Sequence, residues 1–375
     1  MTSIVETKPP ISAAAPSMGR LLSLDALRGF DMFWIIGGGA MFQGLAKGLD
    51  GPLNAVLPQL EHVPWEGLHC WDLIWPLFMF LVGVAIPFSI AGRRAAGASD
   101  RSIYLHALRR AIILFSLGMV LQGRLLAWDL SKFRPCYSVL HGIAAGYLIA
   151  TVAALKLSPK MQAALIGAFL LMYWALLELV PVPGIGQGVL TPEGNLAGWV
   201  DRLILGRFHY GDNTWFLSYL GFASSVLLGV LAGHMLRSNR PAKIKLLSLA
   251  GAGMGCLASG LVWSLTFPII KLLWTSSFVL VGGGVSFLMM ALFYWIIDVM
   301  GYRNWAFFFV VIGMNSIAVY AATSIFRFRQ IGNLFVGSLL PRVGLWDSLL
   351  EASAAFVVIW MLLYWMYRTK SFVKV

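Results

Sequence analysis

Charged residues are scarce in this sequence. Only 12% of its 375 residues are Asp, Glu, Lys or Arg, whereas 59% are hydrophobic. An ordinary soluble domain carries about a quarter charged residues. The composition therefore leaves no room for a sizeable soluble domain, and we expect most of the chain to lie in membrane lipid.

Familiar signatures of metal and nucleotide chemistry are also absent from the sequence. It has no cluster with metal-ligand spacing, no glycine motif of nucleotide-hydrolysing enzymes and no Gly-x-Ser-x-Gly elbow. Three cysteines are too few for a disulfide framework. A disulfide between Cys70 and Cys136 is the minor alternative, and small apolar side chains packed in helices are the favoured interpretation. We expect no metal and no ATP-driven mechanism.

Long apolar stretches dominate the sequence instead. A stretch of about 18 or more apolar residues is long enough to cross the hydrocarbon layer of a bilayer. We predict an all-α, polytopic membrane protein with about ten transmembrane helices in one bundle, at 21–46, 72–91, 103–123, 137–155, 161–180, 215–236, 244–265, 272–298, 305–325 and 346–367. No internal repeat divides the chain, so we expect a short tail at 1–20 and one membrane domain at 21–375.

The net charge of +12 raises the question of a nucleic-acid partner, and the placement of the cations answers it. With the N-terminus inside, fifteen Lys and Arg residues fall in cytoplasmic segments and ten fall in the opposite loops. This bias places both termini in the cytoplasm. We therefore expect membrane lipid as a partner and no nucleic acid.

Ionisable residues inside spans are costly in lipid, so they are the first candidates for function. Ser23, Asp25, Arg28 and Asp31 follow one another at helical spacing at the start of the first span. An internal ion-pair network is the simpler interpretation of these residues. The functional alternative is an anion site in which Arg28 meets a phosphate, with the acids fixing its orientation.

A second cluster is the loop from Glu61 to Asp72, which is dense in titratable and aromatic residues. Either His62 or His69 is suited to taking a proton from an amine, because imidazole titrates near neutral pH. His69 and Asp72 lie one helical turn apart, whereas His62 reaches Asp72 only if the loop folds back. Spacing alone therefore favours His69, and interfacial Trp side chains offer an explanation without chemistry.

A third cluster contains Asn315 and Ser316, followed by Tyr320. Asn and Ser also join membrane helices through hydrogen bonds, and this structural role is the favoured interpretation on chemistry alone. His141 lies in the fourth span, where a histidine is more often a packed core residue than a catalyst. The remaining histidines, His106, His209 and His234, are expected at interfaces or in loops.

These clusters occur together with other motifs in one order along the chain. The motifs are Ser-Leu-Asp-Ala-Leu-Arg-Gly at 23–29, the run from His62 to Phe78, Gly-Trp-Val-Asp-Arg-Leu-Ile-Leu-Gly at 198–206, Leu-Leu-Gly-Val-Leu-Ala-Gly at 227–233, Lys-Leu-Leu-Trp-Thr-Ser-Ser at 271–277 and Gly-Met-Asn-Ser-Ile-Ala-Val-Tyr at 313–320. In this order they resemble the membrane core of the heparan-α-glucosaminide N-acetyltransferase family and its bacterial relatives. The resemblance covers nearly the whole chain.

The resemblance implies that an acetyl group passes from cytosolic acetyl-CoA to the amine of a glucosamine-like acceptor across the membrane. The family's essential histidine matches His62, which overturns the spacing argument for His69. By position, the resemblance makes Asp72, Arg28, Asp25 and Asn315 site residues beside His62. The roles are our inference: catalysis by His62, Asp72 and Asn315, donor binding by Arg28, Asp25 and Ser316, and acceptor binding by Trp65, Lys271, Trp274 and His141.

The sequence departs from the family at positions that would touch the acceptor. Relatives carry glutamine in place of His141 and asparagines in place of Ile270 and Leu272. The acceptor is therefore open, and we expect a multi-pass protein of a bacterial inner membrane acting on an envelope amino sugar. An O-acyltransferase of envelope glycans, or a transporter or flippase, is the alternative. Small residues in the spans are compatible with a homo-oligomer.

Overall fold

The computed structural model describes residues 21–49 and 51–373, so the expected tail at 1–20 lies outside the described residues. The described chain is helical throughout, with two isolated β-bridges and no extended strand. Its α-helices are α1 (Leu22–Phe33), α2 (Gly39–Leu49), α3 (Ile74–Ala95), α4 (Asp100–Leu121), α5 (Val139–Lys156), α6 (Pro159–Leu179), α7 (Leu196–Leu205), α8 (Tyr219–Arg237), α9 (Ala242–Trp263), α10 (Ser276–Phe293), α11 (Ala306–Gly313), α12 (Ser316–Ile325), α13 (Phe328–Val336) and α14 (Asp347–Arg368). This confirms the predicted all-α polytopic architecture.

The membrane spans agree closely with the apolar stretches of the sequence. Within the described residues, eight helices are long and apolar enough to cross a membrane, or nine if the bent pair α11 and α12 counts as one span. The first expected span, 21–46, is not among them, although it forms a helical run from α1 through a π-helical turn at Trp34–Gly38 into α2. Its first half carries the charges of Asp25, Arg28 and Asp31, which lower its hydropathy.

Local sequence signals explain where several of these helices begin. Ser99 and Ser158 cap α4 and α6, since each side chain accepts a hydrogen bond from a backbone N–H three residues later. Pro159 occupies the first turn of α6, where its missing N–H costs nothing. Asn195 caps α7 by accepting from the N–H of Gly198 at 2.6 Å. These polar caps mark the helix ends between apolar stretches.

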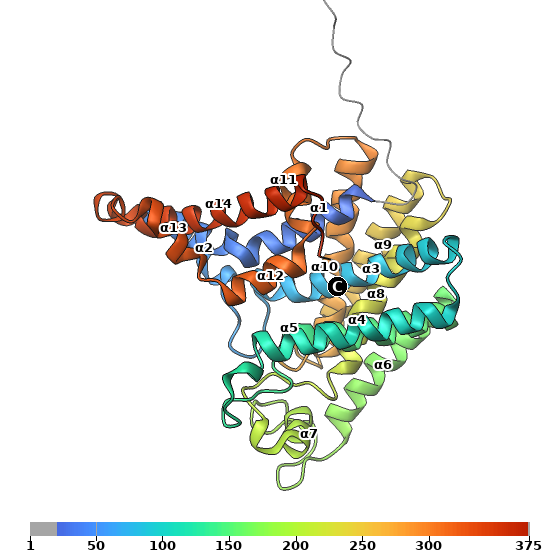
Figure 1. Ribbon diagram of the computed structural model, residues 1–375. Coiled ribbons are helices and arrows are strands. Elements are labelled where there is room, and N and C mark those ends of the chain that lie inside the picture. The colour runs from blue at the N-terminus through green and yellow to red at the C-terminus, as the bar shows by residue number, and fades with distance from the viewer. Residues whose placement is uncertain (1–20, 50, 374–375) are drawn as a thin grey trace, which may run out of the picture.

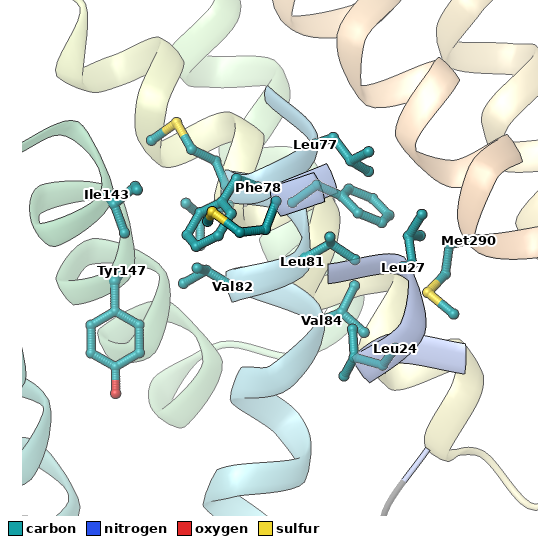
Figure 2. Packing of buried hydrophobic residues seen from close by; sticks show 14 of the residues in the cluster. Leu24, Leu27, Leu77, Phe78, Leu81, Val82, Val84, Ile143, Tyr147 and Met290 are labelled. Carbon is teal, nitrogen blue, oxygen red and sulfur yellow. The ribbon is translucent and has the colours of Figure 1, made fainter. Parts of the chain in front are cut away.

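The core of the bundle is built around α3, α8 and α10. In the most apolar part of α8, 72% of the residues are buried, whereas the corresponding value for α9 is 17%. Helix α9 therefore exposes most of its apolar surface. Figure 2 shows Leu77, Phe78 and Leu81 of α3 lying between Leu27 of α1 and Ile143 of α5. Apolar side chains on the outer helices are stable where lipid surrounds them.

Two helix crossings are unusually tight because glycines meet there. A Cβ atom on Gly83 of α3 would overlap the carbonyl of Val226 in α8, and one on Gly229 would overlap the carbonyl of Phe80. Gly29 of α1 and Gly313 of α11 allow the same close approach. Small residues let membrane helices pack backbone to backbone. The second crossing fixes α1 against the break between α11 and α12.

The loops that carry the second cluster gather at one end of the bundle, where α7 also lies (Figure 1). The Trp65 indole donates to the carbonyl of Leu190 at 2.8 Å, and the N–H of Thr214 donates to the carbonyl of Leu272 at 3.1 Å. Asp201 of α7 is fully buried and accepts from the N–H groups of Trp215 and Phe216 at 2.7 and 3.1 Å. These contacts form a platform beneath the loop of His62.

Candidate active site

The loop that precedes α3 folds back on itself and packs against the loop between α9 and α10. Glu66 and Ile270 form an antiparallel bridge, and the N–H of Gly67 donates to the carbonyl of Ile269 at 2.9 Å. Gly67 has φ of +121°, which side chains other than hydrogen rarely allow. Through this turn the beginning and the end of the loop come together.

His62, Asp72 and Lys271 meet where these two loops touch. The His62 Nδ1 atom lies 2.8 Å from Asp72 Oδ1, and Lys271 Nζ lies 3.1 Å from the same oxygen and 2.8 Å from His62 Nδ1. The Asp72 side chain is 1% exposed, whereas that of His62 is 57% exposed. A buried carboxylate thus holds an imidazole that solvent can reach.

The same carboxylate explains why His62 and His69 differ. The second oxygen of Asp72 accepts the backbone N–H of His69 at 3.1 Å and that of Val63 at 3.4 Å. The His69 ring lies elsewhere and contacts the carbonyl of Glu61 at 3.0 Å. The geometry therefore pairs His62 with Asp72 and leaves His69 as a backbone contact, which the helical spacing did not predict.

Two contacts at Nδ1 bear on the tautomer of the ring. An ionised Asp72 can only accept and so favours a hydrogen on Nδ1, whereas Lys271 Nζ, 2.8 Å from Nδ1 and 3.4 Å from Nε2, faces the ring as a donor when it is charged. Burial lowers the pKa of Lys271, while the charge and hydrogen bond of Asp72 oppose that shift. With its hydrogen on Nδ1, the exposed ring presents Nε2 as its basic nitrogen.

A cavity of about 200 Å³ opens beside this trio. His62 and Lys271 line it together with Trp71, Trp75 and Tyr320. The remaining lining residues are apolar and come from α1, the π-helical turn after it, α3 and α5: Met32, Ile35, Ile74, Phe78, Val139, Leu140 and Ile143. An apolar chamber that ends at a polar cluster is the usual form of a small-molecule site.

The expected acceptor-binding residues fall in different places. Trp65 lies beside the trio on the platform, and Lys271 is part of the trio. Trp274 is 1% exposed, donates from its indole to Ser225 Oγ at 3.0 Å and packs edge-on against Trp75 at 4.5 Å between ring centroids. It therefore supports the cavity wall from behind.

His141 is fully buried, and both of its ring nitrogens contact backbone groups. Its Nδ1 accepts from the N–H of Ser138 at 3.1 Å, so its Nε2 donates to the carbonyl of Phe115 at 3.1 Å. The ring is thus a satisfied neutral core histidine. The neighbouring Leu140 lines the cavity instead.

The expected donor-binding residues lie together on α1 and at the break after α11. Arg28 NH1 is 3.4 Å from Asp25 Oδ1, and Gly313 packs on the backbone of Asp25. Asn315 is 1% exposed and accepts from the N–H of Val373 at 3.1 Å, while its amide nitrogen has no hydrogen-bond partner among the residues that the structure describes. The described contacts do not join Asn315 or Ser316 to the trio.

Tyr320, Trp71 and Trp75 are site residues whose role the sequence did not reveal. The sequence marks Tyr320 only as a neighbour of Asn315, Trp71 as a candidate for an interfacial belt, and Trp75 only as part of the run from His62 to Phe78. One signal was available, because Tyr320 lies four residues after Ser316 and so on the same helix face. This face of α12 extends from the break between α11 and α12, at Ser316, to the cavity that Tyr320 lines.

The part of the chain that the structure describes holds no group of three or more His, Cys, Asp and Glu side chains arranged for a metal ion. Cys70, Cys136 and Cys256 are free, so the disulfide between Cys70 and Cys136 does not form. The site is built from nitrogen and oxygen groups suited to proton transfer.

Comparison with known proteins identifies two curated relatives. Human heparan-alpha-glucosaminide N-acetyltransferase is 25% identical over 382 aligned residues, which cover 84% of this chain and 54% of the human protein. The mouse protein of the same name is 26% identical over 321 residues, or 69% of this chain and 48% of its own length. The chain thus spans about half the length of these relatives. No protein-family model matches it.

Proposed function

Because this chain is a distant relative of the heparan-alpha-glucosaminide N-acetyltransferases, we propose that it is a multi-pass membrane acetyltransferase. In this proposal acetyl-CoA is the donor and an amino sugar on the far side of the membrane is the acceptor. Residues 21–375 form the single catalytic domain. The observation that carries the proposal is the exposed His62 ring, held by a buried carboxylate at the mouth of an apolar cavity.

The Nε2 atom of His62 is the reacting nitrogen in either of two routes. As a general base, it takes a proton from the acceptor amine while that amine attacks the thioester carbon and the CoA thiolate leaves. As a nucleophile, it bonds to the thioester carbon itself, expels the thiolate and then passes the acetyl group to the amine. Asp72 orients the ring in both routes, and Lys271 holds Asp72 ionised.

The donor enters along one face of α1. Arg28 and Met32 lie one turn apart on α1, and Met32 lines the cavity together with Ile35 of the π-helical turn that follows. Four residues of helix rise about 6 Å. CoA phosphates bound by Arg28, with Asp25 fixing the guanidinium, would therefore leave the pantetheine arm pointing along α1 toward His62.

Asn315 and Ser316 lie beside this route and belong to donor binding in the proposal. The Asn315 amide nitrogen is a buried donor without a partner, and such groups usually find an acceptor when a ligand is present. A carbonyl of the pantetheine arm supplies one. Tyr320 lines the cavity, and in the proposal its hydroxyl stabilises the oxyanion that develops on the thioester carbonyl.

The sidedness of the proposal follows from charge placement. Fifteen cations on one side against ten on the other favour cytoplasmic termini, so that the His62 loop faces away from the cytoplasm. This orientation suits a bacterial inner membrane, where acetyl-CoA is available only on the inner face. Trp65 and Lys271 then flank the amino sugar as it approaches the ring, and His141 and Trp274 support the wall from behind.

Purified protein incubated with labelled acetyl-CoA and a panel of amino sugars tests the proposal. We expect an acetylated amine product, and a fall of at least about a hundredfold in rate for His62→Ala. His69→Gln is the matched control, because the His69 ring contacts the carbonyl of Glu61 and not the Asp72 carboxylate. A folded His62→Ala protein with wild-type activity would remove His62 from the mechanism, and an ester product would replace the amine acceptor with a hydroxyl.

A further inference from the structure

A second and larger cavity of about 800 Å³ lies beside the catalytic cavity. Trp71 and Ile35 line both cavities, so they separate the two as a shared wall. The second cavity, which we call the side groove, is formed by the π-helical turn at Trp34–Gly38, Trp71, α2, α12, the start of α13 with the two residues before it, and α14. Nothing in the proposed acetyl transfer uses this space.

The rim of the side groove is polar and positively charged. Its polar lining residues are Gln43, Thr323, Ser324, Arg327, Arg329 and Gln330. No carboxylate lines it among the residues that the structure describes. Glu351, which does not line the groove, lies 4.0 Å from Arg329 and also accepts from the Asn333 amide at 2.7 Å. Two guanidinium groups here face a space that suits an anion.

The inner wall of the side groove is apolar. Ala352, Ala355 and Ile359 lie on one face of α14 and are buried in the bundle, yet they line the groove. Their spacing covers about 10 Å of helix. The groove therefore runs from two cations down an apolar wall, which is the distribution of polarity in an anionic amphiphile.

We propose that the side groove binds a phosphate group and the adjoining hydrocarbon chain of the acceptor, which is an amino sugar carried on an anionic lipid. Arg327 and Arg329 hold the phosphate, and the chain lies along α14. The sugar then passes beside Trp71 and brings its amine to His62. This inference rests on the proposed function for the acetylation of the lipid-linked sugar, but the binding of that lipid in the side groove does not depend on it.

Three probes separate the parts of this ligand. Glucosaminyl octyl phosphate carries the sugar, the phosphate and the chain, octyl glucosaminide lacks the phosphate, and glucosamine 1-phosphate lacks the chain. Binding to protein in neutral detergent is measured without acetyl-CoA. We expect glucosaminyl octyl phosphate to bind about tenfold or more tightly than either other probe, and this preference to shrink at high salt.

The variant carrying Arg327→Gln and Arg329→Gln removes both cations. We expect it to bind glucosaminyl octyl phosphate about tenfold more weakly, so that its preference over octyl glucosaminide disappears. Arg342→Gln is the matched control, since Arg342 is an exposed cation nearby that does not line the groove. It should keep the wild-type preference.

The outcomes distinguish this inference from the proposed function. Arginine-dependent binding without acetyl transfer would leave the lipid site standing and overturn the reaction. Acetyl transfer with equal use of all three probes would support the reaction and overturn the lipid site. A preference that the double variant retains would show that the arginines do not bind the phosphate, and glucosamine 1-phosphate binding as tightly as the octyl ester would exclude the chain site.

Discussion

The orientation of His62 by Asp72 leads to the sharpest prediction. Asp72→Asn keeps the shape of the side chain but replaces one oxygen with an NH2 group. In the native protein, His62 and Lys271 face Oδ1 while two backbone N–H groups face Oδ2. An amide accepts at one oxygen only, so either orientation sets its NH2 group against two donors.

The magnitude follows from these contacts and from burial. Each donor left facing an NH2 group loses roughly 1–3 kcal/mol, so the two together cost about 2–4 kcal/mol after the loop relaxes. Lys271 also loses a charged partner, although its 14% exposure lets water reach the ammonium. We therefore expect a lower melting temperature together with a fall of about 10²–10⁴ in kcat, because Nδ1–H is no longer held.

The assay measures acetyl transfer from labelled acetyl-CoA per amount of monodisperse protein, with thermal denaturation of the same preparation. Glu66→Gln is the control, because Glu66 is an exposed carboxylate in the same loop and contacts its neighbour through backbone only. A transfer rate for Asp72→Asn within twofold of wild type would refute the claim that Asp72 positions the catalytic ring.

Two further predictions concern stability. Trp274 and Trp128 both have a left-handed backbone, with φ of 57° and 52°, but they are 1% and 91% exposed. In thermal denaturation, Trp274→Ala should therefore lower the free energy of unfolding by about 3–5 kcal/mol and Trp128→Ala by little. Equal losses in the two variants would attribute the effect to the backbone. Burial raises the pKa of Asp201 to about 6, against the lowering effect of its two backbone hydrogen bonds. Its folded pKa therefore exceeds its unfolded value, so the stability that it contributes is present below about pH 4 and falls by about 2–3 kcal/mol as pH rises to about 6. Asp201→Asn should lose this part of the pH dependence, and an unchanged profile would contradict the assignment.

The helices could be predicted from sequence because each is encoded locally. The apolar stretches at 103–123 and 244–265 correspond to α4 and α9 within a few residues at each end. The number of spans was less certain at 21–46, where charged residues interrupt an apolar run. The helix continues past these charges but is kinked at Gly37. Hydropathy cannot tell whether the charges of such a run are paired inside the bundle.

The site was only partly predictable, because the sequence does not show which polar groups pair inside the folded bundle. His62 was chosen over His69 by resemblance, since spacing along a helix pointed to the wrong ring for the Asp72 contact. Lys271 is 199 residues from Asp72, so no local pattern could place its ammonium on that carboxylate. His141 and Trp274 were expected at the acceptor, and only packing shows that their polar atoms already have partners.

By itself, the sequence determined that this chain lies in a membrane, that it is helical, and which few polar residues deserved notice, because the cost of burying charge in lipid makes such residues conspicuous. The tertiary structure alone decided which of them meet. It folded the loop back at Gly67 to join His62 with Asp72, brought Lys271 from a distant loop, and opened a groove beside Arg327 and Arg329. These contacts join segments far apart in the chain, and only the packing of the whole bundle brings them together.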